Sequence, residues 1–281
     1  KYFQIIYKYS GIRFLYINIR NFIFFGFIHN CGGKNNNTKV FAGNLLREGL
    51  TSEEIDKIYE NLIMKNGTRK TTSSMRNQNA LDKVIEHLSK NGTKHEISVL
   101  DIGSSNGIDA YTNCIKLQTI TRINKYVLGD LYTEILFDNK RQLIFDQDEY
   151  LLQVLRGKYF VNINFQFTYY YQRITNLLKY IQPYYFKKRL QYNNNNIQRI
   201  QLVHPVLAKE LESSKLFQVQ RLDIRKPILD RYDIIICFHL LTDLYFNNSE
   251  IKTYKKNLIS ILNPGGILIT GTSTKNELIF T

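Results

Sequence analysis

The sequence predicts an α/β fold in which a doubly wound, mostly parallel sheet carries helices on both faces. From residue 97 onward, short apolar runs typical of buried strands alternate with segments that have helical periodicity. A turn of small residues follows the first of these runs. The length of 281 residues exceeds the roughly 200 that one such domain needs, which leaves room for an inserted segment.

Composition and charge exclude several other classes of protein. Hydrophobic residues make up 43% of the chain and charged residues 22%, so it is neither disordered nor collagen-like. Cys31, Cys114 and Cys237 are odd in number and far apart, which favours a reducing compartment, and we expect a cytoplasmic protein. The net charge of +14 indicates a generic basic surface rather than a dedicated nucleic-acid face, because no recognition motif accompanies it.

The first 40 residues are expected to form an apolar and basic leader followed by a linker. Arg13, Asn18 and Arg20 interrupt the apolar stretch over 1–30, so no run reaches the roughly 18–20 residues needed to span a bilayer. This stretch is interpreted as an element packed on the domain or a leader. The alternative is an interfacial anchor that gives peripheral membrane contact.

Residues 41–96 are expected to supply N-terminal helices that pack on the core. Thr51 and Glu54 form a capping box, and apolar residues at helical spacing follow it as far as the stop signal Asn66-Gly67. The apolar stripe within 81–88 predicts a second helix, which ends at Asn91-Gly92.

Residues 97–281 are expected to form the main domain. Its strands are predicted at 97–102, 126–128, 217–224, 232–238 and 267–270, with one antiparallel strand after residue 275. Helices are predicted at 108–118, from His204-Pro205 onward, and after the cap formed by Asn247 and Glu250.

An insertion over 131–215 separates the second and third of these strands by more than a crossover needs. Its first half predicts a meander of hairpins at 134–137, 142–145 and 151–155. Its second half, over 169–189, is aromatic and basic and is expected to be helical.

The run from Asp101 to Gly107 carries the chemistry. Ligands of open α/β sheets bind at the carboxyl ends of the strands, and glycines there let the backbone approach a ligand closely. A dinucleotide site would need the spacing G-x-G-x-x-G, which this turn lacks. The carboxylate of Asp101 suits a cationic ligand better than a pyrophosphate, which disfavours a nicotinamide dehydrogenase.

This run resembles motif I of the class I S-adenosylmethionine-dependent methyltransferases, with Ser105 in place of the middle glycine. Four further pieces resemble later motifs of the family and fall in its order: Gly129-Asp130, Leu222-Asp223-Ile224, the run from Tyr232 to Leu241, and Leu262-Asn263-Pro264-Gly265-Gly266. The resemblance covers about residues 75–281 and leaves 131–215 unmatched.

The resemblance implies a Rossmann-like fold, S-adenosyl-L-methionine as the cofactor and no metal. Asp130 would bind the ribose hydroxyls, Asp223 would flank the adenine, and Asp101 would orient the loop and the cofactor's ammonium. The full set of implied cofactor contacts is Asp101, Gly103, Ser104, Ser105, Gly107, Asp130, Leu131, Asp223, Ile224 and Phe238.

The acceptor of the methyl group is not fixed by these motifs. His239 follows the fourth strand and is a candidate base, although it is more often a pocket-lining or capping residue at such a position. A small-molecule or protein acceptor is favoured. The alternatives are an RNA methyltransferase, whose insertion would bind single strands through aromatic and basic residues, and a non-catalytic RNA- or partner-binding module.

Overall fold

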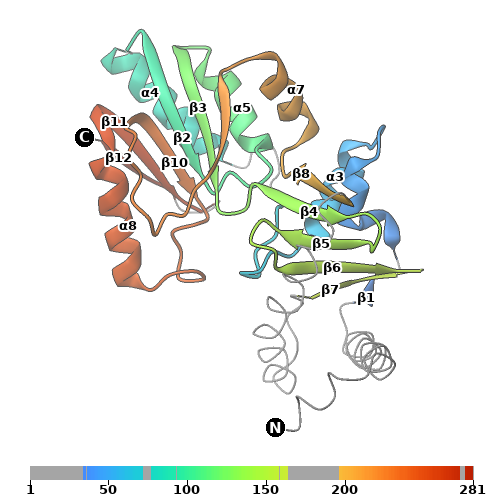
Figure 1. Cartoon of the computed structure of the whole chain (residues 1–281). Coiled ribbons are helices and arrows are strands. Elements are labelled where there is room, and N and C mark those ends of the chain that lie inside the picture. The colour runs from blue at the N-terminus through green and yellow to red at the C-terminus, as the bar shows by residue number, and fades with distance from the viewer. Residues whose placement is uncertain are drawn as a thin grey trace. The chain divides into compact units, whose positions relative to one another are not determined.

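The computed structural model describes residues 34–35, 37–71, 77–92, 94–157, 159–163, 196–272 and 276–280 (Figure 1). Contacts divide the chain into two units. One comprises Lys1–Arg69 and Leu136–Ile200, and the other comprises Lys70–Ile135 and Gln201–Thr281. The second unit contains all the predicted site residues.

The second unit is built on a six-stranded sheet with the order β12-β11-β10-β2-β3-β9. Its strands are β2 (Glu96–Ile102), β3 (Arg122–Asp130), β9 (Phe217–Arg221), β10 (Tyr232–Phe238), β11 (Leu262–Gly271) and β12 (Asn276–Phe280). All neighbours are parallel except β12, which runs antiparallel to β11. The chain adds strands on one side of β2 and then returns to the other side, so a topological switch point lies between β2 and β10.

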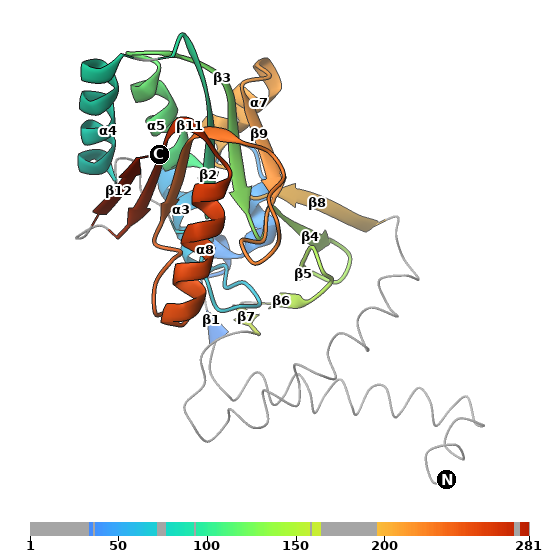
Figure 2. The same ribbon diagram turned by 90° about the vertical axis from the view of Figure 1, so that its left-hand side faces the viewer.

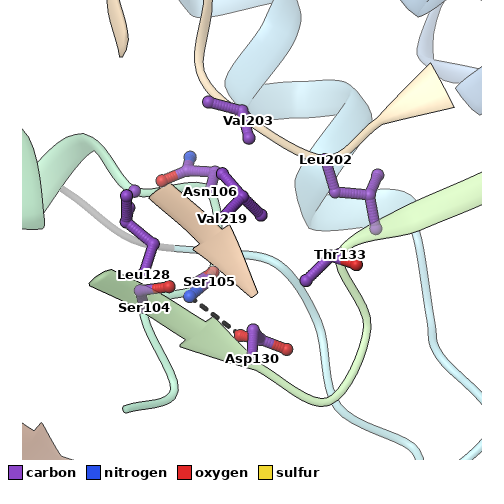
Figure 3. Close-up of a pocket in the computed structure, with 10 residues that line it drawn as sticks. Ser104, Ser105, Asn106, Leu128, Asp130, Thr133, Leu202, Val203 and Val219 are labelled. Atoms are coloured by element: carbon purple, nitrogen blue, oxygen red, sulfur yellow. Dashed lines mark hydrogen bonds between the residues drawn. The ribbon is translucent and has the colours of Figure 1, made fainter. Parts of the chain in front are cut away.

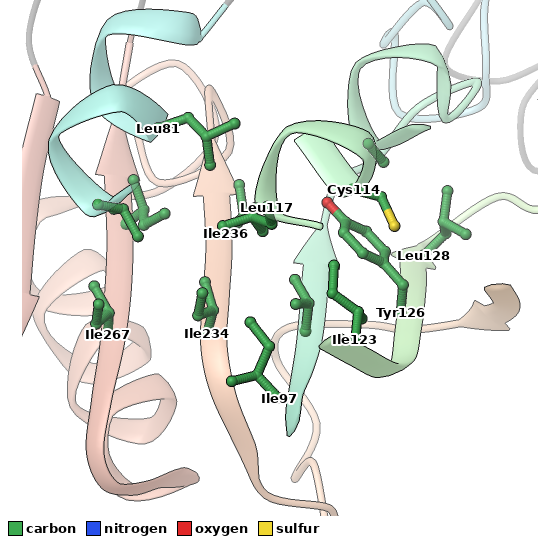
Figure 4. Close-up of a cluster of buried hydrophobic side chains, with 14 of the residues drawn as sticks. Leu81, Ile97, Cys114, Leu117, Ile123, Tyr126, Leu128, Ile234, Ile236 and Ile267 are labelled. Carbon is green, nitrogen blue, oxygen red and sulfur yellow. The ribbon is translucent and has the colours of Figure 1, made fainter. Parts of the chain in front are cut away.

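Helices cover both faces of this sheet, as the sequence predicts (Figures 1 and 2). They are α4 (Gln78–Asn91), α5 (Ile108–Leu117), α7 (Pro205–Ser213) and α8 (Asn248–Ser260). Leu81 of α4 and Leu117 of α5 share one buried cluster with Ile234 and Ile236 of β10 (Figure 4). Leu207 of α7 belongs to the same cluster. Each such buried side chain contributes about 1.5–3 kcal/mol.

The opposite face has its own cluster, in which Leu258 of α8 packs with Leu100 and Ile235. Ile235 lies between the two isoleucines of the other face, as expected because successive side chains of a strand point to opposite sides. The doubly wound, mostly parallel fold is therefore confirmed by the order and direction of the strands and by helices on both faces.

The two helices expected to pack on the core belong to different units. α3 (Ser52–Asn61) has the predicted capping box between Thr51 and Glu54, but it contacts η2 (Thr38–Val40) and η3 (Ala42–Leu46) of the first unit. It also ends at Asn61 instead of Asn66, because Ile63 is extended and forms a bridge with Arg69. α4 belongs to the second unit and packs against its sheet, whereas α3 belongs to the first unit.

The first unit contains a second sheet with the order β1-β7-β6-β5-β4-β8. Its strands are β1 (Lys34–Asn35), β4 (Glu134–Asp138), β5 (Leu143–Asp146), β6 (Leu151–Arg156), β7 (Tyr159–Asn162) and β8 (Ile197–Gln201). The predicted meander is confirmed in β4, β5 and β6, whereas the sequence did not predict β1, β7 or β8. These short strands have weak patterns of their own and depend on pairing with neighbours.

The expected leader over 1–30 and the expected helix over 169–189 lie outside the described residues. Of the predicted insertion over 131–215, contacts assign Leu136–Ile200 to the first unit. Residues from Gln201 onward belong to the second unit, because Val203, Leu207 and Leu211 pack against the cluster beside α5. Within the ranges that the structure describes, no helix combines the length and the apolar character needed to cross a membrane.

Candidate functional site

The carboxyl ends of four parallel strands bring most of the predicted site residues to one edge of the sheet. Asp101 is the second-last residue of β2, Asp130 is the last residue of β3, and Phe238 is the last residue of β10. Asp101 lies in register with Leu128 of β3 and Ile236 of β10. Asp223 follows the end of β9 by two residues. This edge, beside the switch point, is where open α/β sheets bind their ligands.

The loop between β2 and α5 has a backbone that favours glycine at three positions. Gly103, Ser105 and Gly107 have φ angles of 76°, 58° and 78°. A Cβ atom on Gly107 would lie 2.4 Å from Leu207 Cδ2 and 2.7 Å from Leu128 Cδ2, so any other residue there would force two buried leucines to move. Gly103 is exposed, and its amide donates a hydrogen bond to the carbonyl of Gly129 at 2.7 Å.

Ser105 occupies a left-handed conformation that costs an ordinary residue about 1–2 kcal/mol. Its buried Oγ also has no hydrogen-bond partner among the described residues. We expect Ser105→Gly to raise the free energy of unfolding by about 1 kcal/mol, because glycine adopts this φ without strain. Urea unfolding measures the change. Ser104→Gly is the control, and we expect it to destabilise the protein because Ser104 does not have a positive φ.

Asp101 is a buried carboxylate with little hydrogen bonding. It is 7% exposed, and among the described residues it accepts one long hydrogen bond, from the hydroxyl of Tyr126 at 3.3 Å. Burial, together with the nearby carboxylate of Asp109, raises the pKa of Asp101 to about 8. A cationic group placed beside Asp101 would restore its charge, so this position favours a positively charged ligand.

Asp109, in the first turn of α5, lies close enough to Asp101 to affect its charge and is bound by Asn77. Asn77 Nδ2 donates a hydrogen bond to Asp109 Oδ2 at 2.9 Å, and both residues are buried. Neither residue belongs to a motif of the sequence. Asp109 has only the appearance of an ordinary first-turn acid of a helix, and Asn77 that of an ordinary N-cap.

Asp130 is held by three donors and has a buried cation as its partner. Its Oδ1 accepts from Lys70 Nζ at 2.5 Å and from the amide of Tyr132 at 3.0 Å, and its Oδ2 accepts from the amide of Ser105 at 2.9 Å. Lys70 is only 3% exposed. Sequence reasoning missed Lys70, because it is separated from Asp130 by 60 positions and belongs to no motif.

Asp223 also has a cationic partner. Arg225 donates from Nε and Nη2 to its two carboxylate oxygens, each at 2.7 Å. The hydrogen bonds from Arg225 keep the pKa of Asp223 below its usual value, so it is ionised at neutral pH. Its neighbour Ile224 is buried, and Leu131, after β3, is half-buried.

His239 lies directly after β10 and has a strained backbone for a residue other than glycine. Its φ is 57°, and its amide donates a hydrogen bond to the carbonyl of Gly271 at 2.8 Å. The next residue, Leu240, would be 3.7 Å from a Cβ on Gly103, so this segment lies next to the loop after β2. Phe238 packs against the cluster that contains α4 and α5. Such strain is frequent at functional sites, and the role of His239 as a base stays a prediction.

A small pocket lies between the loop, β3 and β9 (Figure 3). It is lined by Ser104, Ser105, Asn106, Gly107, Leu128, Asp130, Thr133, Leu202, Val203 and Val219. Ser105 Oγ and Asn106 Nδ2 are buried without a hydrogen-bond partner among the described residues. Four of the lining residues were predicted site residues, whereas Asn106 and the wall at 202–203 were not. These two residues are far from the loop in the sequence. The fold brings them to it, and the backbone amide of the nearby His204 donates a hydrogen bond to the carbonyl of Asn106 at 2.8 Å.

Among known proteins, only solved structures are similar to this chain. No family model matches the sequence, and no curated protein matches it significantly. The chain resembles an S-adenosylmethionine-dependent methyltransferase from Clostridium acetobutylicum, with 14% identity and a TM-score of 0.33 over 69% of this chain and 49% of that one. It thus spans about half the length of the clostridial protein.

Two further solved structures are similar to the same degree. The N-methyltransferase NodS from Bradyrhizobium japonicum, in complex with S-adenosyl-l-homocysteine, is 10% identical with a TM-score of 0.35, over 77% of this chain and 71% of that one. Magnesium protoporphyrin IX methyltransferase from Synechocystis, with bound SAM, is 12% identical with a TM-score of 0.32, over 84% and 70%.

Proposed function

We propose that this chain is an S-adenosylmethionine-dependent methyltransferase of the class I type, which binds its cofactor at the carboxyl edge of β2, β3 and β10. The observation that carries the proposal is Asp101 beside the switch point, a buried carboxylate that accepts a single long hydrogen bond from the part of the chain that the structure describes. A carboxylate in this state gains most from a cationic ligand. The cofactor's amino-acid part carries an ammonium group and its sulfur is a sulfonium.

The other groups at this edge fit the remaining parts of the cofactor. Exposed Gly103 leaves space for the amino-acid part, and the Lys70–Asp130 pair offers both donors and an acceptor to ribose hydroxyls. Two buried polar atoms without partners, Ser105 Oγ and Asn106 Nδ2, line the pocket next to Asp130. A pyrophosphate would bring negative charge toward Asp101 and Asp130, which disfavours a dinucleotide.

The bound cofactor supplies a methyl group on a positively charged sulfur. The chain's own residues then have to hold the two reactants in line and exclude water. Residues 238–241 follow β10 next to the loop after β2, a position from which His239 would accept a proton from a hydroxyl or amine acceptor. We propose that the methyl acceptor is a small molecule or a protein. We also propose that the protein acts in the cytoplasm.

Calorimetry with S-adenosylhomocysteine tests the cofactor site. We expect micromolar binding by the wild-type protein, and Asp130→Asn should weaken it at least tenfold, because hydrogen bonds to charged groups contribute about 1.5–3 kcal/mol. Asn keeps the size of Asp130 while it removes the negative charge beside Lys70.

Asp233→Asn is the matched control. Asp233 is also paired with a lysine, Lys94, at 2.6 Å, but it is the second residue of β10 and therefore lies at the amino edge of the same sheet. We expect this variant to bind like the wild type. A folded wild-type protein that does not bind S-adenosylhomocysteine would contradict the proposed function.

A further inference from the structure

We propose that Lys70 determines recognition of the cofactor's ribose: Lys70 and Asp130 act as a pair, in which the ammonium of Lys70 donates to a ribose hydroxyl oxygen while it fixes the carboxylate of Asp130. This inference rests on the proposed function, because it names a further residue of the same cofactor site. No motif of the sequence contains Lys70.

The burial of Lys70 is the first argument. Its side chain is 4% exposed, and its Nζ lies 2.5 Å from Asp130 Oδ1. An ammonium has three N–H donors. Among the described residues, the structure gives this one a single hydrogen bond, to Asp130. Withdrawing an ammonium from water is costly unless its donors are satisfied, so a ligand rich in oxygen acceptors fits this position.

The second argument is that most hydrogen-bond acceptor positions of Asp130 are already occupied. Its two oxygens offer about four acceptor positions in total. Lys70, the amide of Ser105 and the amide of Tyr132 already use three of them. One remaining position does not suffice for both hydroxyls of a ribose. The donors of Lys70 therefore complete the contact by binding a hydroxyl oxygen.

Lys94, at the other edge of the same sheet, is a lysine that pairs with a strand carboxylate away from the proposed cofactor site. Lys94 pairs with Asp233 at 2.6 Å, and its side chain is 49% exposed. Asp233 additionally accepts from Ser98 and Asn263. That lysine keeps its remaining donors in water, at the edge where ligands do not bind. Lys70 is buried at the edge where they do.

The experiment measures the affinity of S-adenosylhomocysteine and of its 2′-deoxy and 3′-deoxy analogues by calorimetry. Wild-type protein is compared with Lys70→Met, Lys70→Arg and, as the matched control, Lys94→Met. For the wild type we expect at least one deoxy analogue to bind tenfold more weakly than S-adenosylhomocysteine. In Lys70→Met we expect the parent ligand to bind at least tenfold more weakly and this discrimination to disappear.

Lys70→Arg should retain part of both affinity and discrimination, because it keeps a cation with several donors, and Lys94→Met should match the wild type. Lys70→Met with unchanged or tighter binding would overturn the inference, since Lys70 would then be absent from the contact or would obstruct it. Weaker binding with the discrimination intact would also overturn it, because a merely structural role has that effect.

Folding is controlled with the double variant Lys70→Met/Asp130→Asn, which leaves no unpaired buried charge. Circular dichroism verifies that each variant is folded before its affinity is compared. If Lys70→Met does not fold, the double variant is compared with Asp130→Asn instead of the wild type, so that the difference between the two reports Lys70 alone. Failure of the proposed function is distinct, because wild-type protein would then bind none of the three ligands.

Discussion

Gly107→Ala is expected to lower the free energy of unfolding by about 3 kcal/mol. The added Cβ would lie 2.4 Å from Leu207 Cδ2 and 2.7 Å from Leu128 Cδ2, and overpacking of this kind costs about 1–3 kcal/mol. The φ of 78° adds about 1–2 kcal/mol for a residue other than glycine, which the reduced freedom of the unfolded chain partly offsets.

Gly265→Ala separates the two contributions. Gly265 has a similar φ of 75°, but nothing lies within 4 Å of a Cβ placed on it. We expect this variant to lose only about 1 kcal/mol, which is the conformational part alone. Urea unfolding of both variants beside the wild type measures the difference. An equal loss of unfolding free energy in both variants would show that contact with Leu128 and Leu207 does not exclude a side chain at position 107.

Binding of S-adenosylhomocysteine is expected to strengthen as the pH rises from 6 to 8, by as much as tenfold per pH unit. The pKa of Asp101 is raised to about 8 by burial and by Asp109, so the free protein holds this carboxyl protonated over that range. The ligand's ammonium favours the ionised form, and binding therefore releases a proton. Asp101→Asn stays neutral at every pH, and we expect its affinity to be weaker at pH 8 and nearly independent of pH.

The same group makes the stability depend on pH, with a defined sign. Asp101 has a pKa of about 8 in the folded protein and an ordinary pKa of 3.8 when unfolded. Between these values the folded state binds a proton that the unfolded state releases. The proton on Asp101 therefore contributes its full stabilisation below pH 3.8. This stabilisation falls by up to about 1.4 kcal/mol per pH unit as the pH rises from 3.8, and it is lost once the pH has passed through 8.

Unfolding of wild type and Asp101→Asn at several pH values measures this contribution. Because Asn imitates the protonated carboxyl, the variant should gain stability relative to the wild type as the pH rises from 5 to 8. A difference that stays constant over this range would mean that Asp101 is ionised in the folded protein and would remove the reason for the pH dependence of binding.

The sequence by itself determined the elements whose signals are local. The capping boxes of α3 and α8 each lie within four residues, and both formed as predicted. The buried strands β2, β10 and β11 are apolar runs bounded by turns. Parallel pairing then placed Asp101 and Asp130 at one edge, because strands that run in the same direction end on the same side.

Local signals were less successful where a segment depends on distant partners. β8 has the sequence Ile-Gln-Arg-Ile-Gln, in which only Ile200 is buried, so its pattern alone does not predict a strand. The apolar residue Ile63 continues a helical spacing, yet it is extended and pairs with Arg69. In both cases the structure depends on pairing between backbone groups. The periodicity of the side chains does not predict such pairing.

What the sequence determined about this protein is the order of its elements and the identity of the loop and carboxylates that the motif carries. What only the tertiary structure decided is the state of those carboxylates. Asp101, Asp130 and Asp223 look alike in the sequence, but the first is buried with one long hydrogen bond, the second is paired with buried Lys70, and the third is held by Arg225. The charge state of a carboxylate depends on water, cations and donors within a few ångströms, and residues far apart in the chain supply them.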